Sequence, residues 1–320
     1  MPIRDETPET AIPSFPEGVP GAPAHRASFP GGRGARGGGP GGGWGGWRGK
    51  HLSRAFAPPF LTSHPFAENL GKVREKSPLI LCLTNFVTVA DCANALLAIG
   101  ASPVMSLSPE DAGEIAAFAA GVVLNIGTLN DETLASMKKA AEIARARKIP
   151  VILDPAGVGA TSVRKKAALW LAEIAKPAVI RGNSQEILAL AGTLGQRQKG
   201  VDSDSAQNLG ELAETAKTLA KTTGAVIGAT GETDVVANAK EVIFLKGGSP
   251  LMTKLTGTGC VLSAVVGAFV GARPQNPLDA AASAMSFLKL AGERAEKALS
   301  PPGALGELKA RLHDALSLIR

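Results

Sequence analysis

Residues 255–269 read LTGTGCVLSAVVGAF, two closely spaced glycines followed by an apolar pattern with helical periodicity. Gly257 and Gly259 allow the backbone to turn tightly and to expose its N–H groups. Because a helix begins there, these donors and the positive end of the helix dipole face the same point. The stretch therefore predicts a site for a phosphate, or for a phosphoryl group during its transfer; the alternative is a simple connecting turn.

Outward from this turn, short β-rich runs alternate with helical patterns from Pro78 onward. Such alternation is typical of βα units and a mainly parallel sheet, and it predicts one α/β domain over residues 65–320. The predicted strands span residues 79–84, 103–106, 122–126, 151–154, 178–181, 225–229, 234–237 and 242–245. After residue 259 the pattern is helical almost to the end, with a break at residues 300–303.

Two helix starts and one loop are also predicted. Ser108 has the place of an N-cap before Pro109, and the spacing of Asn183 and Glu186 is that of a capping box. Residues 200–204 are predicted to form a loop before a helix over residues 209–222.

Residues 1–64 differ in composition from the rest of the chain. They are rich in proline and then, over residues 31–50, in glycine with scattered arginine, which predicts a disordered extension. They carry seven of the 34 basic and four of the 28 acidic residues, so half of the net charge of +6 lies in them. Nucleic-acid binding through this Gly/Arg segment, with Trp44 and Trp47 as stacking side chains, is the less favoured alternative.

Cysteine and histidine usage excludes several classes of site. The three cysteines are widely spaced, without a CxxC motif, which argues against a disulfide scaffold or a structural zinc. His313 is the only histidine after residue 64, so a histidine triad or a multi-histidine metal site is not expected. No uninterrupted run of 18 apolar residues and no signal-peptide pattern occurs, and a cytoplasmic location without membrane contact is expected.

Several polar residues follow predicted strands, where ligands of parallel α/β sheets bind. Asp154 ends a strand before Pro155. It either forms an Asx turn or places its carboxylate near Mg²⁺. Glu186 completes the capping box, and from there it can also orient a metal-bound water. Arg164 is either a surface residue or, if the Gly-rich turn before it faces a nucleotide, a phosphate ligand.

Four further residues have two interpretations each. Thr230 is a turn residue or holds a phosphate or ribose with its hydroxyl. Met105 belongs to the core or lines a pocket for a flat heteroaromatic ring, to which Asn85 could donate a hydrogen bond unless it only bridges a loop. Cys260, at a helix start that favours a thiolate, either deprotonates an alcohol or fills the turn while backbone donors act.

Seven blocks of the chain, in order, resemble the hydroxyethylthiazole kinase family of the ribokinase-like superfamily. The resemblance runs from about residue 66 to residue 318, and its specific blocks are SPLILCLTNFV (77–87), ANALLAIGASPVM (93–105), VLNIGTL (123–129), VILDPAGVGAT (151–161), IRGNSQEI (180–187), TGETDVV (230–236) and PLMTKLTGTGCVLSAVVGAF (250–269). After residue 64 neither GxxxxGK[ST] nor GxGxxG is intact, so a nucleotide must be held there in another way.

The resemblance implies a ribokinase-like three-layer α/β/α fold and an ATP- and Mg²⁺-dependent kinase. Its reaction would transfer the γ-phosphoryl group to the primary hydroxyl of 4-methyl-5-(2-hydroxyethyl)thiazole, for thiamine salvage. The family also implies a homotrimer with active sites between subunits. The Gly-rich extension has no counterpart in the family.

The resemblance also implies roles for residues at matching motif positions. Met105 and Gly257 would contact the thiazole, and Asp154 and Glu186 match the acidic pair associated with Mg²⁺ and phosphates. Arg164 and Thr230 would contact ATP, and Cys260 sits where most ribokinase-like enzymes carry an aspartate base.

Two other activities of the superfamily are alternatives, namely hydroxymethylpyrimidine kinase and the nucleotide-dependent dehydratase of hydrated nicotinamide cofactors. The cysteine of GTGC and the early TNFV block favour the thiazole enzyme. Leu81, where the family often has histidine, and residues 89–92 depart from the family pattern on the expected thiazole side.

Overall fold

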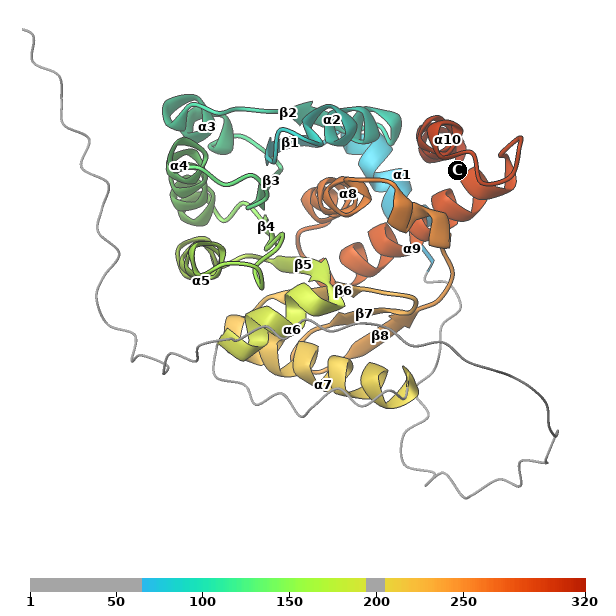
Figure 1. The fold of residues 1–320 in the computed structure, drawn as a ribbon. Coiled ribbons are helices and arrows are strands. Elements are labelled where there is room, and N and C mark those ends of the chain that lie inside the picture. The colour runs from blue at the N-terminus through green and yellow to red at the C-terminus, as the bar shows by residue number, and fades with distance from the viewer. Residues whose placement is uncertain (1–64, 194–204) are drawn as a thin grey trace, which may run out of the picture. The chain divides into compact units, whose positions relative to one another are not determined.

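The computed structural model describes residues 65–193 and 205–320, which form an α/β domain around an eight-stranded sheet (Figure 1). The strand order is β2-β1-β3-β4-β5-β6-β7-β8. The strands are β1 (Leu79–Leu83), β2 (Ser102–Val104), β3 (Gly121–Asn125), β4 (Val151–Asp154), β5 (Val179–Asn183), β6 (Val226–Thr230), β7 (Asp234–Ala237) and β8 (Val242–Leu245). Pairings from β2 through β6 are parallel, and β7 is antiparallel to both β6 and β8.

Helices cover both faces of the sheet, as Figure 1 shows. One layer contains α1 (Ala67–Lys76), α2 (Val89–Ala98), α8 (Thr258–Ala272), α9 (Pro277–Lys297) and α10 (Leu305–Leu318). The other contains α3 (Pro109–Ala116), α4 (Asp131–Arg147), α5 (Ser162–Ala175), α6 (Ser184–Thr193) and α7 (Ser205–Thr223). Along β1, Ile80 and Cys82 belong to the first apolar cluster and Leu81 and Leu83 to the second, the two-residue period of a strand covered on both faces. The expected three-layer α/β/α architecture is confirmed.

The predicted strands are all present, with ends that differ by two residues at most. Both helix starts are confirmed: Ser108 Oγ accepts a hydrogen bond from Asp111 N, and Asn183 and Glu186 exchange backbone-to-side-chain bonds of 2.9 and 2.8 Å. The helix over residues 209–222 is confirmed within α7. The extension 1–64 and the loop 200–204 lie outside the described residues.

The C-terminal helical region differs from the prediction in one place. Besides the break at residues 300–303, it is interrupted between Ala272, the end of α8, and Pro277, the start of α9. Pro277 has no N–H to continue a helix but fits its first position, and Asn276 caps α9 by accepting from Asp279 N. The two prolines at 274 and 277 were the signal in the sequence for this interruption.

The parallel strands bring their carboxyl ends to one edge of the sheet. In register, Asn125 pairs with Asp154 and Asn183 with Thr230, so polar side chains of β3, β4, β5 and β6 share this edge. Helix α8 packs against β1, β3, β4 and β5. Within the described ranges, no helix has the length and apolar character needed to cross a membrane.

Candidate active site

Cys260 lies in the first turn of α8, at the edge where the strands end. Gly257 caps this helix with φ of 85°, a left-handed conformation that suits glycine. The Cys260 Sγ accepts hydrogen bonds from Asn85 Nδ2 at 3.1 Å and from Asn125 Nδ2 at 3.3 Å. Two neutral amides, one following β1 and one ending β3, thus fix the sulfur as a hydrogen-bond acceptor.

Asp154 is connected to Cys260 through Asn125. The Asn125 amide also donates to Asp154 Oδ2 at 2.8 Å, and Ser263 Oγ, one turn along α8, donates to the same oxygen at 2.7 Å. Asp154 is only 2% exposed, and burial raises the pKa of its carboxyl group, while Arg181 and the two hydrogen bonds oppose this rise. The carboxylate is therefore buried mainly among neutral donors.

Arg181, in the middle of β5, joins this region to Thr230. Its Nη2 donates to Thr230 Oγ1 at 2.8 Å and its Nη1 donates to Gly259 O at 2.8 Å. Its Nη1 lies 3.8 Å from Asp154 Oδ2, which is within the distance of an ion pair but too long for a hydrogen bond. The side chain is buried, and its Nε has no hydrogen-bond partner in the described part of the chain.

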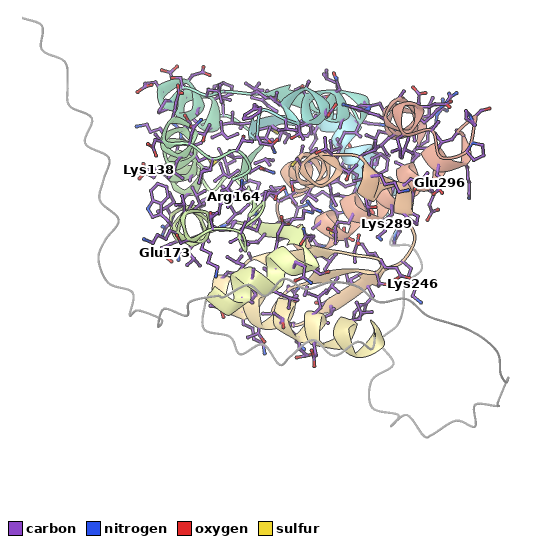
Figure 2. All side chains as sticks on the ribbon, in the orientation of Figure 1. Lys138, Arg164, Glu173, Lys246, Lys289 and Glu296 are labelled. Carbon is purple, nitrogen blue, oxygen red and sulfur yellow. The ribbon has the colours of Figure 1, made fainter. Side chains whose placement is uncertain are left out.

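Glu186 and Arg164 both bind the backbone of the turn after β4. Figure 2 shows Arg164 beside α5. Glu186 Oε1 accepts from Gly157 N at 2.8 Å, so the capping residue of α6 also holds the Gly-rich turn. Arg164 Nη1 donates to Ala156 O at 3.0 Å, and a Cβ on Gly157 would overlap the guanidinium group. Arg164 thus lies across the turn with its guanidinium bound to the backbone.

Met105 and Gly257, the two predicted thiazole contacts, lie at the same edge. Met105 directly follows β2, which is parallel to β1, and it packs half-buried against the apolar cluster that also contacts Cys260. A Cβ on Gly257 would overlap Thr88 Cγ2, and Thr88 Oγ1 donates to Asn85 Oδ1 at 3.1 Å. The loop between β1 and α2 is thus packed directly against the start of α8.

The acidic residues fit a magnesium ion. No group of three or more histidine, cysteine, aspartate or glutamate side chains suited to a metal occurs within residues 65–193 and 205–320. Mg²⁺ does not need one, because it keeps several waters and binds through one or two carboxylates. The side-chain hydrogen bonds to Asp154 end on Oδ2, which leaves Oδ1 available, and the Glu186 charge is close enough to raise the pKa of Asp154.

Three residues of the site, Asn125, Ser263 and Arg181, have no role in the sequence analysis. Asn125 could have been found as Asp154 was, since it ends an otherwise apolar run at the same edge. An arginine in the middle of a buried parallel strand was the signal for Arg181. No signal in the sequence indicated Ser263, because a serine in an apolar helix is common.

The fold and the site define an α/β enzyme with a helix start, a buried carboxylate and a guanidinium group converging at the strand ends. Residues 70–320 match the model of the hydroxyethylthiazole kinase family. The chain belongs to this family of kinases.

Similar sequences and a similar solved structure support this assignment to the family. The chain is 47% identical over 230 residues to a hydroxyethylthiazole kinase of Leptospira interrogans, covering 72% of this chain and 85% of the relative. It is 46% identical over 239 residues to that of Clostridium acetobutylicum, covering 73% and 87%. The solved structure of a hydroxyethylthiazole kinase protein from Pyrococcus horikoshii matches with a TM-score of 0.72 and 36% identity, covering 80% and 93%. The expected ribokinase-like fold class is confirmed.

Proposed function

We propose that this protein transfers the γ-phosphoryl group of ATP to the primary hydroxyl of 4-methyl-5-(2-hydroxyethyl)thiazole and so supplies the thiazole phosphate of thiamine salvage. Membership of the family supports this reaction. The observation that carries it in the structure is the start of α8, where Cys260 faces Asp154 through the Asn125 amide. Family membership favours this reaction over phosphorylation of hydroxymethylpyrimidine and over the dehydratase reaction.

Cys260 is the proposed general base. The proton of the acceptor hydroxyl passes to the thiolate form of Cys260 as the hydroxyl oxygen bonds to the γ-phosphorus, and the bond from that phosphorus to the bridging oxygen of ADP breaks. Asn85 and Asn125 hold the sulfur in place by donating to it. The backbone N–H groups of residues 257–260 come before the first N–H that is hydrogen-bonded within α8. They have no partner within the helix and face the transferred charge.

Arg181 and Thr230 are the proposed contacts to ATP. Arg181 joins Thr230 to Gly259, so a single guanidinium group spans the distance from the β6 end to the start of α8. Arg164 remains a second candidate for the phosphates, although its Nη1 is bound to Ala156 O. Asp154 and Glu186 would hold Mg²⁺, which when bound neutralises phosphate charge.

Exposed apolar side chains next to the site support an assembly. Phe86, which directly follows Asn85, is 78% exposed, and Leu107, two residues after Met105, is 60% exposed. Large exposed apolar side chains that lie together mark interaction surfaces. We propose the homotrimer with active sites between subunits that the family resemblance implies, in which Met105 and Gly257 line the thiazole pocket. A cytoplasmic location stays a prediction.

A direct assay tests the function. The purified protein is incubated with ATP, Mg²⁺ and the thiazole alcohol, and the product is analysed by mass spectrometry. Parallel reactions contain hydroxymethylpyrimidine or hydrated NADH instead. We expect thiazole phosphate and ADP in the first reaction, also from a variant that lacks residues 1–64. Product in one of the parallel reactions alone would contradict the proposal.

A further inference from the structure

Lys289, on α9, lies among four oxygen atoms that come from two segments, residues 231–234 and the loop after β8. Its Nζ is 3.1 Å from Asp234 Oδ1 and donates to the backbone oxygens of Gly247 at 3.0 Å, Glu232 at 3.3 Å and Gly231 at 3.5 Å. The carboxylate begins β7, two carbonyls belong to the turn between β6 and β7, and one belongs to the loop after β8. An ammonium group has three N–H donors, so all of them are used here.

The loop after β8 is shaped to lie against α9. Gly247 and Gly248 have φ of 100° and 91°, and a Cβ on Gly247 would lie 2.5 Å from Glu293 Oε1. The same Glu293 oxygen accepts a hydrogen bond from Gly248 N at 2.8 Å. Lys289 and Glu293 lie one turn apart on α9. Lys289 therefore binds a carbonyl oxygen of this loop, and Glu293 binds one of its N–H groups.

The turn between β6 and β7 depends on the same lysine. Gly231 and Glu232 are exposed, so apolar packing contributes little to their position. Gly231 N donates to Asp234 Oδ1 at 3.0 Å, the oxygen that Lys289 also contacts. Figure 2 shows Lys289 on the α9 side of the molecule, away from Arg164.

This turn continues directly from the proposed nucleotide contact. Thr230 precedes Gly231, and Thr230 Oγ1 accepts the hydrogen bond from Arg181, whose other nitrogen binds Gly259 O. The contacts of Lys289 thus extend, through one turn and one arginine, to the start of α8.

We propose that Lys289 is a positioning residue of the nucleotide site, in which its ammonium group takes the place of a bound monovalent cation and fixes the turn that carries Thr230. Three carbonyl oxygens and a carboxylate are ligands that K⁺ or NH₄⁺ accepts in proteins. In this protein the cation is attached to α9, so the turn and the loop after β8 are held together permanently. The proposal rests on the proposed function for its role in ATP binding, but not for the cation-like site itself.

The test is the variant Lys289→Ala, which removes the ammonium group and leaves its oxygen partners. We expect the KM for ATP to rise by about tenfold or more, while kcat and the KM for the thiazole alcohol change by less than about threefold. Added ammonium or potassium chloride lowers the KM for ATP again, whereas tetramethylammonium chloride at equal ionic strength does not, because it is too large for the site.

Lys297→Ala is the matched control, since Lys297 is an exposed lysine near the end of the same helix. This variant and the unaltered protein should show no difference between ammonium and tetramethylammonium. An unchanged KM for ATP in Lys289→Ala, or a parallel loss of kcat and of both affinities, would overturn the positioning role.

Thermal unfolding separates this proposal from the function. Ammonium chloride, compared with tetramethylammonium chloride, should raise the unfolding temperature of Lys289→Ala but not of Lys297→Ala. If the unaltered protein proved inactive with the thiazole alcohol, this measurement would still decide the cation-like site. Equal unfolding temperatures in the two salts would overturn it.

Discussion

Asp154 and Asp234 are equally buried at 2% and 3% exposure, yet their partners differ. Asp154 receives hydrogen bonds from the neutral groups of Asn125 and Ser263, and its nearest guanidinium nitrogen, from Arg181, is 3.8 Å away. Asp234 is paired directly with the ammonium group of Lys289 at 3.1 Å. Burial raises the pKa of both carboxyl groups.

The comparison distinguishes a carboxylate kept for a ligand from one used by the fold. Neutral donors hold Asp154 in place and Arg181 Nη1 is 3.8 Å away, so its charge is balanced less directly than that of Asp234 and can still attract a cation. The charge of Asp234 is already balanced by Lys289, and removing one partner of such a pair leaves an uncompensated charge. On this basis we propose that the Asp154 side of the site performs the chemistry and that the Asp234 side positions it.

The largest expected effect tests the reacting side directly. Cys260→Ala should lower kcat by about 10²–10⁴, the usual contribution of a general base. Cys260→Asp should keep or raise kcat, because a carboxylate can accept the same proton. Steady-state kinetics of both variants measure this. Equal rates for Cys260→Ala and the unaltered protein would show that the backbone donors of α8 act without this base.

A smaller effect is expected for the arginine that connects the two sides. Arg181→Ala should raise the KM for ATP by about 10- to 100-fold, because hydrogen bonds from a charged donor are each worth about 1.5–3 kcal/mol. Arg164→Ala, which removes the second candidate, should raise this KM by less, because Arg164 Nη1 is bound to Ala156 O. Circular dichroism checks that both variants fold. The reverse order of effects would assign the phosphates to Arg164.

The smallest effect concerns stability at the Asp234 side. Since burial raises the pKa of Asp234 above 3.8, and Lys289 only partly opposes this, the folded protein keeps this proton at a pH where the unfolded chain has lost it. Its contribution to the free energy of unfolding is therefore complete below pH 3.8 and falls as the pH rises through the raised pKa.

Asp234→Asn removes this dependence. The free energy of unfolding of the variant, measured with denaturant and compared with that of the unaltered protein, should shift in favour of the variant as the pH rises through this range. The lost ion pair with Lys289 adds an offset but does not reverse the direction. A difference that is constant with pH would show that Asp234 has the same pKa in both states.

The sequence by itself determined the strands of the sheet and the edge at which the proposed site lies. Strand periodicity and turn residues act locally, so the strand ends, the caps at Ser108 and Asn183 and the glycine turn at Gly257 could be predicted from short stretches. Asp154 and Cys260 followed from their places at a strand end and a helix start.

The tertiary structure alone decided which side chains meet. Asn125 bridges Asp154 and Cys260, and Arg181 reaches Thr230 and Gly259, across separations of 29 to 135 residues in the sequence. Such pairings depend on the order of strands in the sheet and on the packing of α8 and α9 against it. A local pattern carries no information on that order, which is why the hydrogen bonds of Arg181 to Thr230 and Gly259 could not be predicted from the sequence.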